Sequence, residues 1–171
     1  PPTDSSAPAT TDVGASSTVH KRRGTPLILG DSVMVGASGA LRRAGYVVDA
    51  QISRTFAAGY GLVLKYRRQG KVGDIVVIGL GTAGGITDNQ IDKLMSLLGS
   101  VRHVIFITPQ TAGRKFEKAS RQSLLDAAQR YSNVTIIDWW LLAQPYLKFH
   151  DGAKGVAFKD LYFYRDRIHI V

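Results

Sequence analysis

Residues 26–37, Pro-Leu-Ile-Leu-Gly-Asp-Ser-Val-Met-Val-Gly-Ala, combine a short apolar strand with the first turns of a helix. The strand, Pro26 to Gly30, carries no polar side chain, as is typical of a parallel sheet that helices cover on both faces. Ser32 follows where the strand ends and the helix begins, and there unpaired N–H groups and the helix dipole favour an anion. The position also fits a simple helix cap at Asp31 or Ser32, which is the commoner use of such residues.

Outward from this stretch, short runs rich in Val and Ile alternate with longer amphipathic segments from Thr25 onward. This alternation is typical of βαβ units around a parallel sheet. The predicted strands are Pro26 to Gly30, Val47 to Gln51, Ile75 to Leu80, Val104 to Thr108 and Val134 to Asp138. The predicted helices cover about residues 32–44, 58–69, 88–99, 115–131 and 139–143. We therefore predict an α/β protein, a three-layer αβα sandwich around a five-stranded parallel sheet.

Residues 1–24 have a different composition, dominated by Ser, Thr, Ala, Pro and Asp with almost no large apolar side chains. Such a segment can bury too little apolar surface to offset the entropy that it would lose on ordering, so we predict a flexible linker. The globular domain then spans residues 25–171. The first residue is proline and no signal-peptide pattern follows, so we expect an upstream segment to be missing from this sequence.

Bulk composition limits the possible functions. The 171 residues fit one domain, predicted to be monomeric, and contain no apolar run long enough to span a membrane. The net charge is +9. It either favours binding to acidic polymers or only keeps the protein in solution. Cysteine is absent, which excludes disulfides and a thiol nucleophile. The histidines show no metal-ligand spacing, so we predict neither a metal nor a cofactor.

The last residues offer a base for the Ser32 hydroxyl. Asp166 and His169 are three positions apart, so the carboxylate can reach Nδ1 of the imidazole while Nε2 points toward a serine. An Asp-x-x-His pair on its own is common and is usually a surface pair. The pairing with Ser32 at the other end of an α/β pattern is far more specific.

That combination resembles the SGNH hydrolase superfamily, whose first block is similar to residues 27–37 and whose last block is similar to residues 166–169. Other stretches resemble the extracytoplasmic SGNH domain of bacterial peptidoglycan O-acetyltransferases. They are Val48-Asp-Ala50 with Ser53-Arg54, Asp74 to Thr82, and Val134 to Trp139. The likeness covers about residues 26–171 and implies a flavodoxin-like sheet.

The resemblance implies a serine-dependent O-acyltransferase with the triad Ser32, His169 and Asp166. An acyl donor, usually of acetyl groups, would load Ser32, and the acceptor would be a hydroxyl of a cell-wall or surface polysaccharide. The family also implies a membrane acyltransferase domain attached through the linker, and a location outside the cytoplasm, tethered to the plasma membrane. An esterase or deacetylase on the same triad and a catalytically degenerate glycan-binding domain remain alternatives. No recognised motif supports specific binding of nucleic acid.

One departure concerns the oxyanion hole. The family usually has Gly-Thr-Asn-Gly where this chain has Gly81-Thr82-Ala83-Gly84, and alanine cannot donate a hydrogen bond. Losing one such donor costs about 3 kcal/mol of transition-state stabilisation. Remaining candidate donors and substrate contacts are the backbone N–H of Ser32, the N–H of Ser53 or Arg54, and the side chains of Thr82 and Gln110.

Overall fold

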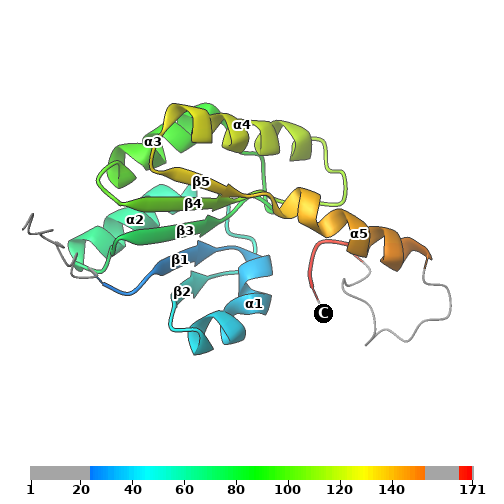
Figure 1. The fold of residues 1–171 in the computed structure, drawn as a ribbon, viewed down its shortest axis with the longest axis horizontal. Helices are drawn as coiled ribbons and strands as arrows, with labels where there is room; N and C mark the ends of the chain where they lie inside the picture. The colour runs from blue at the N-terminus through cyan, green and yellow to red at the C-terminus, as the bar shows by residue number, and fades with distance from the viewer. Residues whose placement is uncertain (1–23, 153–165, 171) are drawn as a thin grey trace, which may run out of the picture.

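A computed structural model of the chain describes residues 24–152 and 166–170 (Figure 1). The linker predicted for residues 1–24 lies outside the described residues except for Gly24. The strands are β1 (Leu27–Gly30), β2 (Val47–Ala50), β3 (Ile75–Gly79), β4 (His103–Ile107) and β5 (Val134–Ile137). The helices are α1 (Ser32–Arg43), α2 (Ala58–Arg68), α3 (Asp88–Leu98), α4 (Glu117–Arg130) and α5 (Trp139–Gly152).

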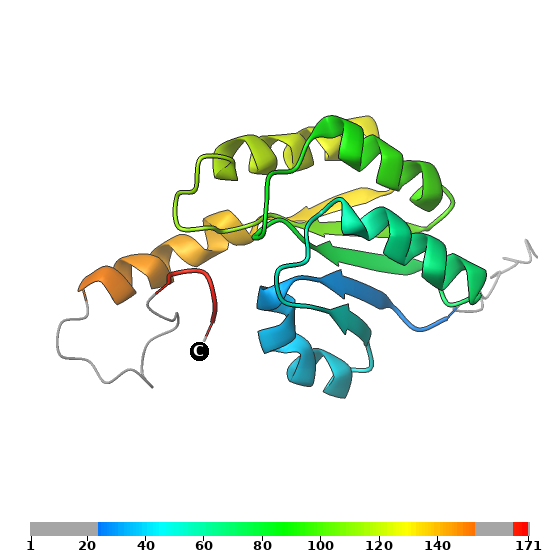
Figure 2. The ribbon, with the colours of Figure 1, turned by 180° about the vertical axis from the view of Figure 1, so that it is seen from behind.

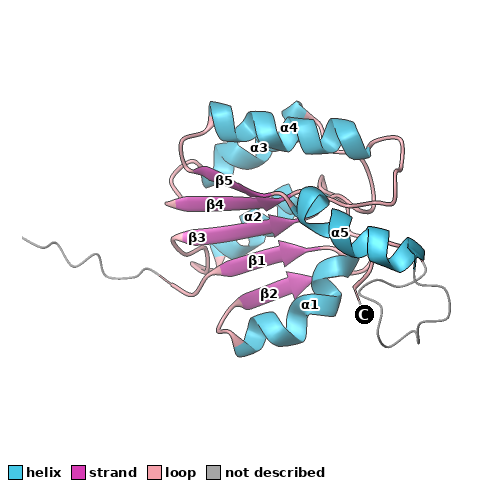
Figure 3. Ribbon diagram, turned by 45° about the vertical axis from the view of Figure 1, so that its right-hand side comes forward, coloured by secondary structure: helices cyan, strands magenta, loops and turns pink. Residues whose placement is uncertain are grey.

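The strands form one five-stranded sheet in the order β2-β1-β3-β4-β5, and all neighbours are parallel. The α/β class and the flavodoxin-like sheet are therefore confirmed. Helices α2, α3 and α4 cover one face, and α1 covers part of the other (Figures 1 and 2). Helix α5 leaves the end of β5 and runs outward, beyond the carboxyl ends of the strands (Figure 3).

Two hydrophobic clusters hold these layers together. The larger one joins alternate residues of the strands, such as Leu27, Leu29 and Phe106, to the buried faces of α2, α3 and α4. The smaller one joins the intervening residues, such as Ile28 and Val77, to α1. Because both faces of the central strands are buried, their sequences are continuously apolar rather than alternating. This property made the strands predictable to within about one residue.

Helix α5 is longer than predicted, since it continues to Gly152 and not to residue 143. The prediction ended before Pro145, because a proline inside a helix removes a donor and costs about 3 kcal/mol. In the structure, Ala143 and Leu147 lie on either side of Pro145, are buried, and pack against the partly buried Trp139 and Ile170. This tertiary packing outweighs the local preference. Among the described helices, none is both long and apolar enough to cross a bilayer.

Glycine allows α1 to approach the sheet closely beside the strand end that precedes Ser32. A Cβ atom added to Gly30 would lie 2.1 Å from the Cβ atom of Met34, and one added to Gly79 would lie 2.8 Å from the Cγ atom of Met34. The first distance requires a shift of the helix, and the second requires at least a movement of the Met34 side chain. The close packing of α1 on β1 and β3 therefore depends on these two glycines.

We expect Gly30→Ala to lower the free energy of unfolding by about 1–3 kcal/mol, because the added methyl group overpacks the contact with Met34. Gly61→Ala is the matched control, since a Cβ atom at this position in α2 meets nothing within 4 Å. It should stabilise the fold by about 0.5–1 kcal/mol through helix propensity. Urea unfolding followed by circular dichroism measures both, and equal effects would contradict the packing argument.

Candidate active site

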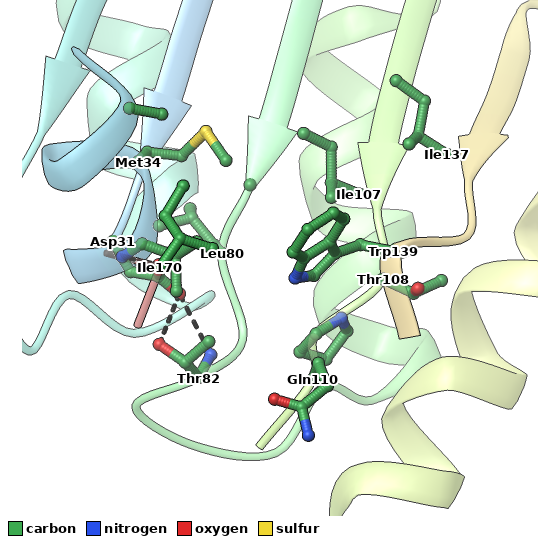
Figure 4. A pocket seen from close by; sticks show the side chains of 14 residues that line it. Asp31, Met34, Leu80, Thr82, Ile107, Thr108, Gln110, Ile137, Trp139 and Ile170 are labelled. Carbon is green, nitrogen blue, oxygen red and sulfur yellow. Dashed lines mark hydrogen bonds between the residues drawn. The ribbon is translucent and has the colours of Figure 1, made fainter. Parts of the chain in front are cut away.

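Asp31 connects the start of α1 to the end of β3. Its Oδ1 atom accepts a hydrogen bond from the N–H of Val33 at 3.1 Å, which caps the helix. Its Oδ2 atom accepts from the N–H groups of Gly81 and Thr82 at 3.1 and 3.0 Å, and from the Thr82 hydroxyl at 2.8 Å (Figure 4). The cap is therefore Asp31, and Ser32, the first residue of α1, keeps its hydroxyl for another partner.

That partner is His169, which lies 137 residues away in the sequence. Its Nε2 atom is 2.7 Å from the Oγ atom of Ser32, and its Nδ1 atom is 2.5 Å from the Oδ2 atom of Asp166. The other oxygen of Asp166 accepts from the N–H groups of Ile168 and His169, at 2.9 and 3.1 Å. The structure thus brings the three predicted triad residues together in the order Asp166, His169, Ser32.

The electrostatics of Asp166 suit an orienting carboxylate. Burial raises its pKa, but the hydrogen bond from His169, those from the N–H groups of Ile168 and His169, and the charge of His169 outweigh this. The pKa of Asp166 is therefore held below its ordinary value, and the group is a carboxylate at neutral pH. In this state Asp166 accepts a hydrogen bond from a protonated Nδ1, so the unprotonated Nε2 faces Ser32.

Gln110, predicted as a possible oxyanion donor, is buried and contacts the turn that carries Asp166 and His169. In the amide orientation that satisfies both groups, its nitrogen donates to the carbonyl of Arg167 at 2.5 Å and its oxygen accepts from the N–H of Ala112 at 3.1 Å. Both neighbours are in the left-handed region, with φ of 59° at Arg167 and 57° at Ala112. In this structure Gln110 supports the backbone between Asp166 and His169.

A second buried carboxylate was not found from the sequence. Glu117 is the only glutamate of the chain. It accepts hydrogen bonds from the N–H and hydroxyl of Thr111 at 2.5 and 2.7 Å, from the N–H of Gly113 at 3.3 Å and from Nε1 of Trp140 at 2.9 Å. Burial raises the pKa of Glu117, but these donors together hold it below the usual range. Glu117 thus joins the loop after β4 to the first turn of α5.

The loop after β2 carries the other predicted donors. The Arg54 guanidinium is nearly buried and donates to the Asp49 carbonyl at 2.6 Å, to its carboxylate at 2.8 Å and to the Gly30 carbonyl at 3.3 Å. Burial opposes the charge of Asp49, yet Arg54, helped by Tyr66 and Lys65, lowers the pKa of this carboxyl. The Arg54 side chain is therefore part of the scaffold that joins this loop to the end of β1.

The predicted oxyanion donors differ in whether they already have a hydrogen-bond acceptor among the described residues. The Thr82 hydroxyl donates to Asp31, and the amide of Gln110 contacts Arg167 and Ala112. The backbone N–H of Ser32 and that of Ser53 have no acceptor within the part of the chain that the structure describes. Ser53 also has a left-handed backbone, with φ of 61°.

A mostly apolar cavity of about 220 Å³ lies beside the triad, between α1, the ends of β3, β4 and β5, and the start of α5 (Figure 4). Asp31 and Val33, on either side of Ser32, line it together with Ile170, which follows His169. Trp139 also lines it, whereas Trp140 lies under the Arg121 guanidinium, 4.8 Å from the ring centre. Among the described residues no group of His, Asp and Glu could hold a metal ion.

Comparison with known proteins points to one group of enzymes. No family model matches the chain. It is 34% identical over 145 residues to the “Putative O-acetyltransferase” of Staphylococcus aureus strain COL, covering 79% of this chain and 24% of that protein. It is 27% identical over 152 residues to O-acetyltransferase OatA of S. aureus strain NCTC 8325, covering 87% and 23%. The chain resembles the OatA-type O-acetyltransferases, as its sequence predicted. It spans about a quarter of the length of these relatives.

Solved structures agree on the fold. The C-terminal catalytic domain of Streptococcus pneumoniae peptidoglycan O-acetyltransferase A superposes with a TM-score of 0.69 at 21% identity, covering 87% of this chain and 81% of that domain. A GDSL-like lipase from Bacteroides thetaiotaomicron superposes with a TM-score of 0.52 at 14% identity, covering 86% and 80%. The fold of this chain is therefore that of the SGNH and GDSL hydrolases.

Glu117→Gln should lower the free energy of unfolding by about 1–3 kcal/mol at pH 7, because an amide nitrogen would face donors that now meet a carboxylate. The pKa of Glu117 is lowered by folding, so its contribution is complete above the unfolded pKa of about 4.3 and is lost as the pH falls through the lower folded value. The difference in the free energy of unfolding between the parent protein and Glu117→Gln should therefore disappear at acidic pH.

Urea unfolding at several pH values between 3 and 8 measures this gap. Asp126→Asn is the matched control on the same helix, because Asp126 is partly exposed and accepts from Gln122 at 2.8 Å. It should change the stability by less than about 0.5 kcal/mol. A gap for Glu117→Gln that stays constant down to pH 3 would contradict the role of its charge.

Proposed function

We propose that this domain is a serine-dependent O-acyltransferase that forms an acyl-enzyme on Ser32. The observation that carries the proposal is the chain of contacts from Asp166 through His169 to Ser32, at 2.5 and 2.7 Å. A serine hydroxyl at the start of a helix, facing an imidazole that a carboxylate orients, is an activated nucleophile. Ser32 and the pair Asp166 and His169 come from distant parts of the chain. A chance Asp-His pair on the surface would not also face a serine hydroxyl.

In the first half-reaction, Ser32 Oγ attacks the carbonyl carbon of the acyl donor while its proton passes to Nε2 of His169. The Oγ–C bond forms, and the carbonyl oxygen becomes an oxyanion. When the oxyanion collapses, the bond from carbon to the leaving oxygen breaks, and that oxygen takes the proton from Nε2. The products are the acyl-enzyme and the donor alcohol, and Asp166 stabilises the imidazolium throughout.

In the second half-reaction, a sugar hydroxyl gives its proton to Nε2 of His169 as its oxygen attacks the acyl carbon. The new C–O bond forms, the Oγ–C bond breaks, and Ser32 recovers its proton from the imidazolium. Acyl transfer is complete with no net consumption of protons. The backbone N–H groups of Ser32 and Ser53 are the proposed oxyanion donors in both steps. Thr82 and Gln110 would not contact the oxyanion and would only hold the neighbouring backbone in place.

The relatives support acetyl as the acyl group and a cell-wall glycan as the acceptor. One relative is named O-acetyltransferase, and “Putative peptidoglycan O-acetyltransferase YrhL” of Bacillus subtilis is 30% identical over 115 residues, covering 66% of this chain and 18% of that protein. We extend the proposal to the whole protein: a membrane acyltransferase domain would deliver the acetyl group, and this domain would act outside the cytoplasm, tethered to the plasma membrane.

An esterase on the same triad is the second candidate. The side chains of His169 and Asp166 are 36% and 45% exposed, so water can approach the imidazole that activates an acceptor. Solved structures with this fold also include the esterase AlinE4, with a TM-score of 0.55 at 13% identity. Transfer and hydrolysis use the same residues and differ only in which hydroxyl reaches the acyl-enzyme.

A fluorophosphonate probe should label Ser32, and Ser32→Ala should abolish labelling. We expect His169→Ala and Asp166→Asn to slow turnover of an activated acetyl ester by about 10³- to 10⁴-fold, because the first removes the base and the second its orientation. Mass spectrometry should detect the acetylated peptide that contains Ser32. His103→Ala, at the opposite edge of the sheet, is the control and should retain full activity. Absence of labelling in the parent protein would favour a degenerate glycan-binding domain.

Ala83→Asn tests the oxyanion hole. If the domain works with two backbone donors, a third donor should raise the rate of acylation by about 10²- to 10³-fold. Ala83→Asp is the matched control, because an ionised aspartate has the same shape but cannot donate a hydrogen bond. Stopped-flow acylation by an activated acetyl ester measures the rates. Equal rates for Ala83→Asn and Ala83→Asp would contradict the proposal that residue 83 lies next to the oxyanion.

A further inference from the structure

The amino edge of the sheet, where the parallel strands begin, carries a group of exposed cations. The last turns of α1, α2 and α3 and the loops that follow them lie at this edge (Figure 3). In these segments, residues 40–46, 65–74 and 96–102, Asp74 is the only acidic residue. Their basic residues, which are all exposed and which we call the basic edge, are Arg42, Arg43, Lys65, Arg67, Arg68, Lys71 and Arg102.

The helix dipole accounts for only part of this charge. Cations in the last turn of a helix interact favourably with its final carbonyls, which suits the arginines that end α1 and α2. Lys71 and Arg102, however, lie in loops. Among the residues of the basic edge, only Lys65 forms an ion pair within the described part of the chain, with Asp49 at 3.6 Å. The remaining charge is therefore available to an external anion.

The chain enters the domain at the basic edge. Gly24, the first described residue, lies against the loop before β3, because a Cβ atom added to it would be 3.2 Å from the Cα atom of Gly73. Residues 1–23 therefore join the domain here, and their last three, residues 21–23, are Lys-Arg-Arg. Tyr46, in the loop after α1, is 36% exposed and adds an amphipathic ring of the kind that is enriched at membrane–water interfaces.

We propose that the basic edge binds the surface of a bilayer that contains anionic lipids. This inference rests on the proposed function, in which the segment before Gly24 leads to a membrane domain, so that this edge lies nearest to the membrane. A flexible linker alone does not set which face of the domain approaches the bilayer, whereas a charged edge does. Each Lys or Arg near an anionic surface strengthens binding by about fivefold, and this attraction falls off within a Debye length.

Binding through the basic edge turns the proposed site away from the bilayer. Ser32 lies at the carboxyl edge of the sheet, and strands of 4 or 5 residues separate the two edges by about 15 Å. The site then faces the side on which a cell-wall glycan would lie. Binding that depends on screened charges is reversible, so the domain can also leave the surface to receive the acyl group.

Co-sedimentation with vesicles measures this binding. The chain should sediment with vesicles of phosphatidylcholine and phosphatidylglycerol in equal parts, should stay in solution with phosphatidylcholine alone, and should be released by high salt. The triple variant Arg68→Gln, Lys71→Gln, Arg102→Gln should bind about 10²-fold more weakly, since it removes three cations from the basic edge. None of the three side chains forms an ion pair within the described residues, so the fold should be unaffected, which thermal unfolding checks.

The matched control removes three cations from the carboxyl edge. Arg114, Lys115 and Lys118 are exposed and lie in the loop before α4 and in its first turn. Their triple substitution by Gln lowers the net charge equally and should leave vesicle binding close to that of the parent. Equal loss of binding in the two triple variants would show an effect of net charge alone and would overturn the assignment to the basic edge.

Tryptophan fluorescence reports which edge meets the bilayer. The two tryptophans of the chain, Trp139 and Trp140, lie at the start of α5, beyond the carboxyl edge. Lipids with a nitroxide quencher on the headgroup should leave the fluorescence of the bound parent unchanged and should quench Tyr46→Trp. Quenching in the parent, or complete displacement from the vesicles by soluble polyphosphate of equal phosphate content, would contradict a membrane contact through this edge.

Fluorophosphonate labelling of Ser32 separates this proposal from the proposed function. The basic-edge variant should be labelled as fast as the parent, because its three substitutions lie at the opposite edge of the sheet from Ser32. A parent that binds vesicles but is not labelled would contradict the serine mechanism alone. A parent that is labelled but does not sediment with the anionic vesicles would overturn the membrane contact alone.

Discussion

The buried carboxylate of Asp31 is the interaction on which the rest of the site depends. A charge without partners in such a position would cost several kcal/mol, and here the capped helix and the loop after β3 supply the hydrogen bonds that offset it. One oxygen sets where α1 begins, and the other holds Gly81 and Thr82. The start of α1 and the end of β3 therefore cannot move independently, and Ser32 is fixed between them.

The other half of the triad is fixed by a different mechanism. Asp166 and His169 belong to a turn whose backbone N–H groups donate to the Asp166 carboxylate, so the two residues form one unit. Gln110 holds that unit by the Arg167 carbonyl. Because the carboxyl ends of parallel strands meet at one edge, a loop after β4 can support a turn that approaches α1. The triad geometry is thus a property of the sheet and not of the C-terminal turn alone.

These mechanisms explain what the sequence could predict. The strands were found because continuous apolar runs mark parallel strands with two buried faces, and Ser32 was found because it follows such a strand directly. Glu117 and the contact made by Gln110 were missed, because each depends on loops that come together only in the folded chain. The end of α5 was missed because burial of Ala143 and Leu147 overrides the local effect of Pro145.

Competition between acceptor and water decides whether such a site transfers or hydrolyses. A group that stabilises the oxyanion helps attack by water as much as attack by a sugar, so a side-chain donor at residue 83 would speed transfer and hydrolysis alike. Selectivity for transfer must then come from residence of the acceptor beside the acyl-enzyme. Holding a hydroxyl in place raises its effective concentration by orders of magnitude over free encounter. A side chain that binds the sugar and not water would therefore favour transfer without changing Ser32, His169 or Asp166.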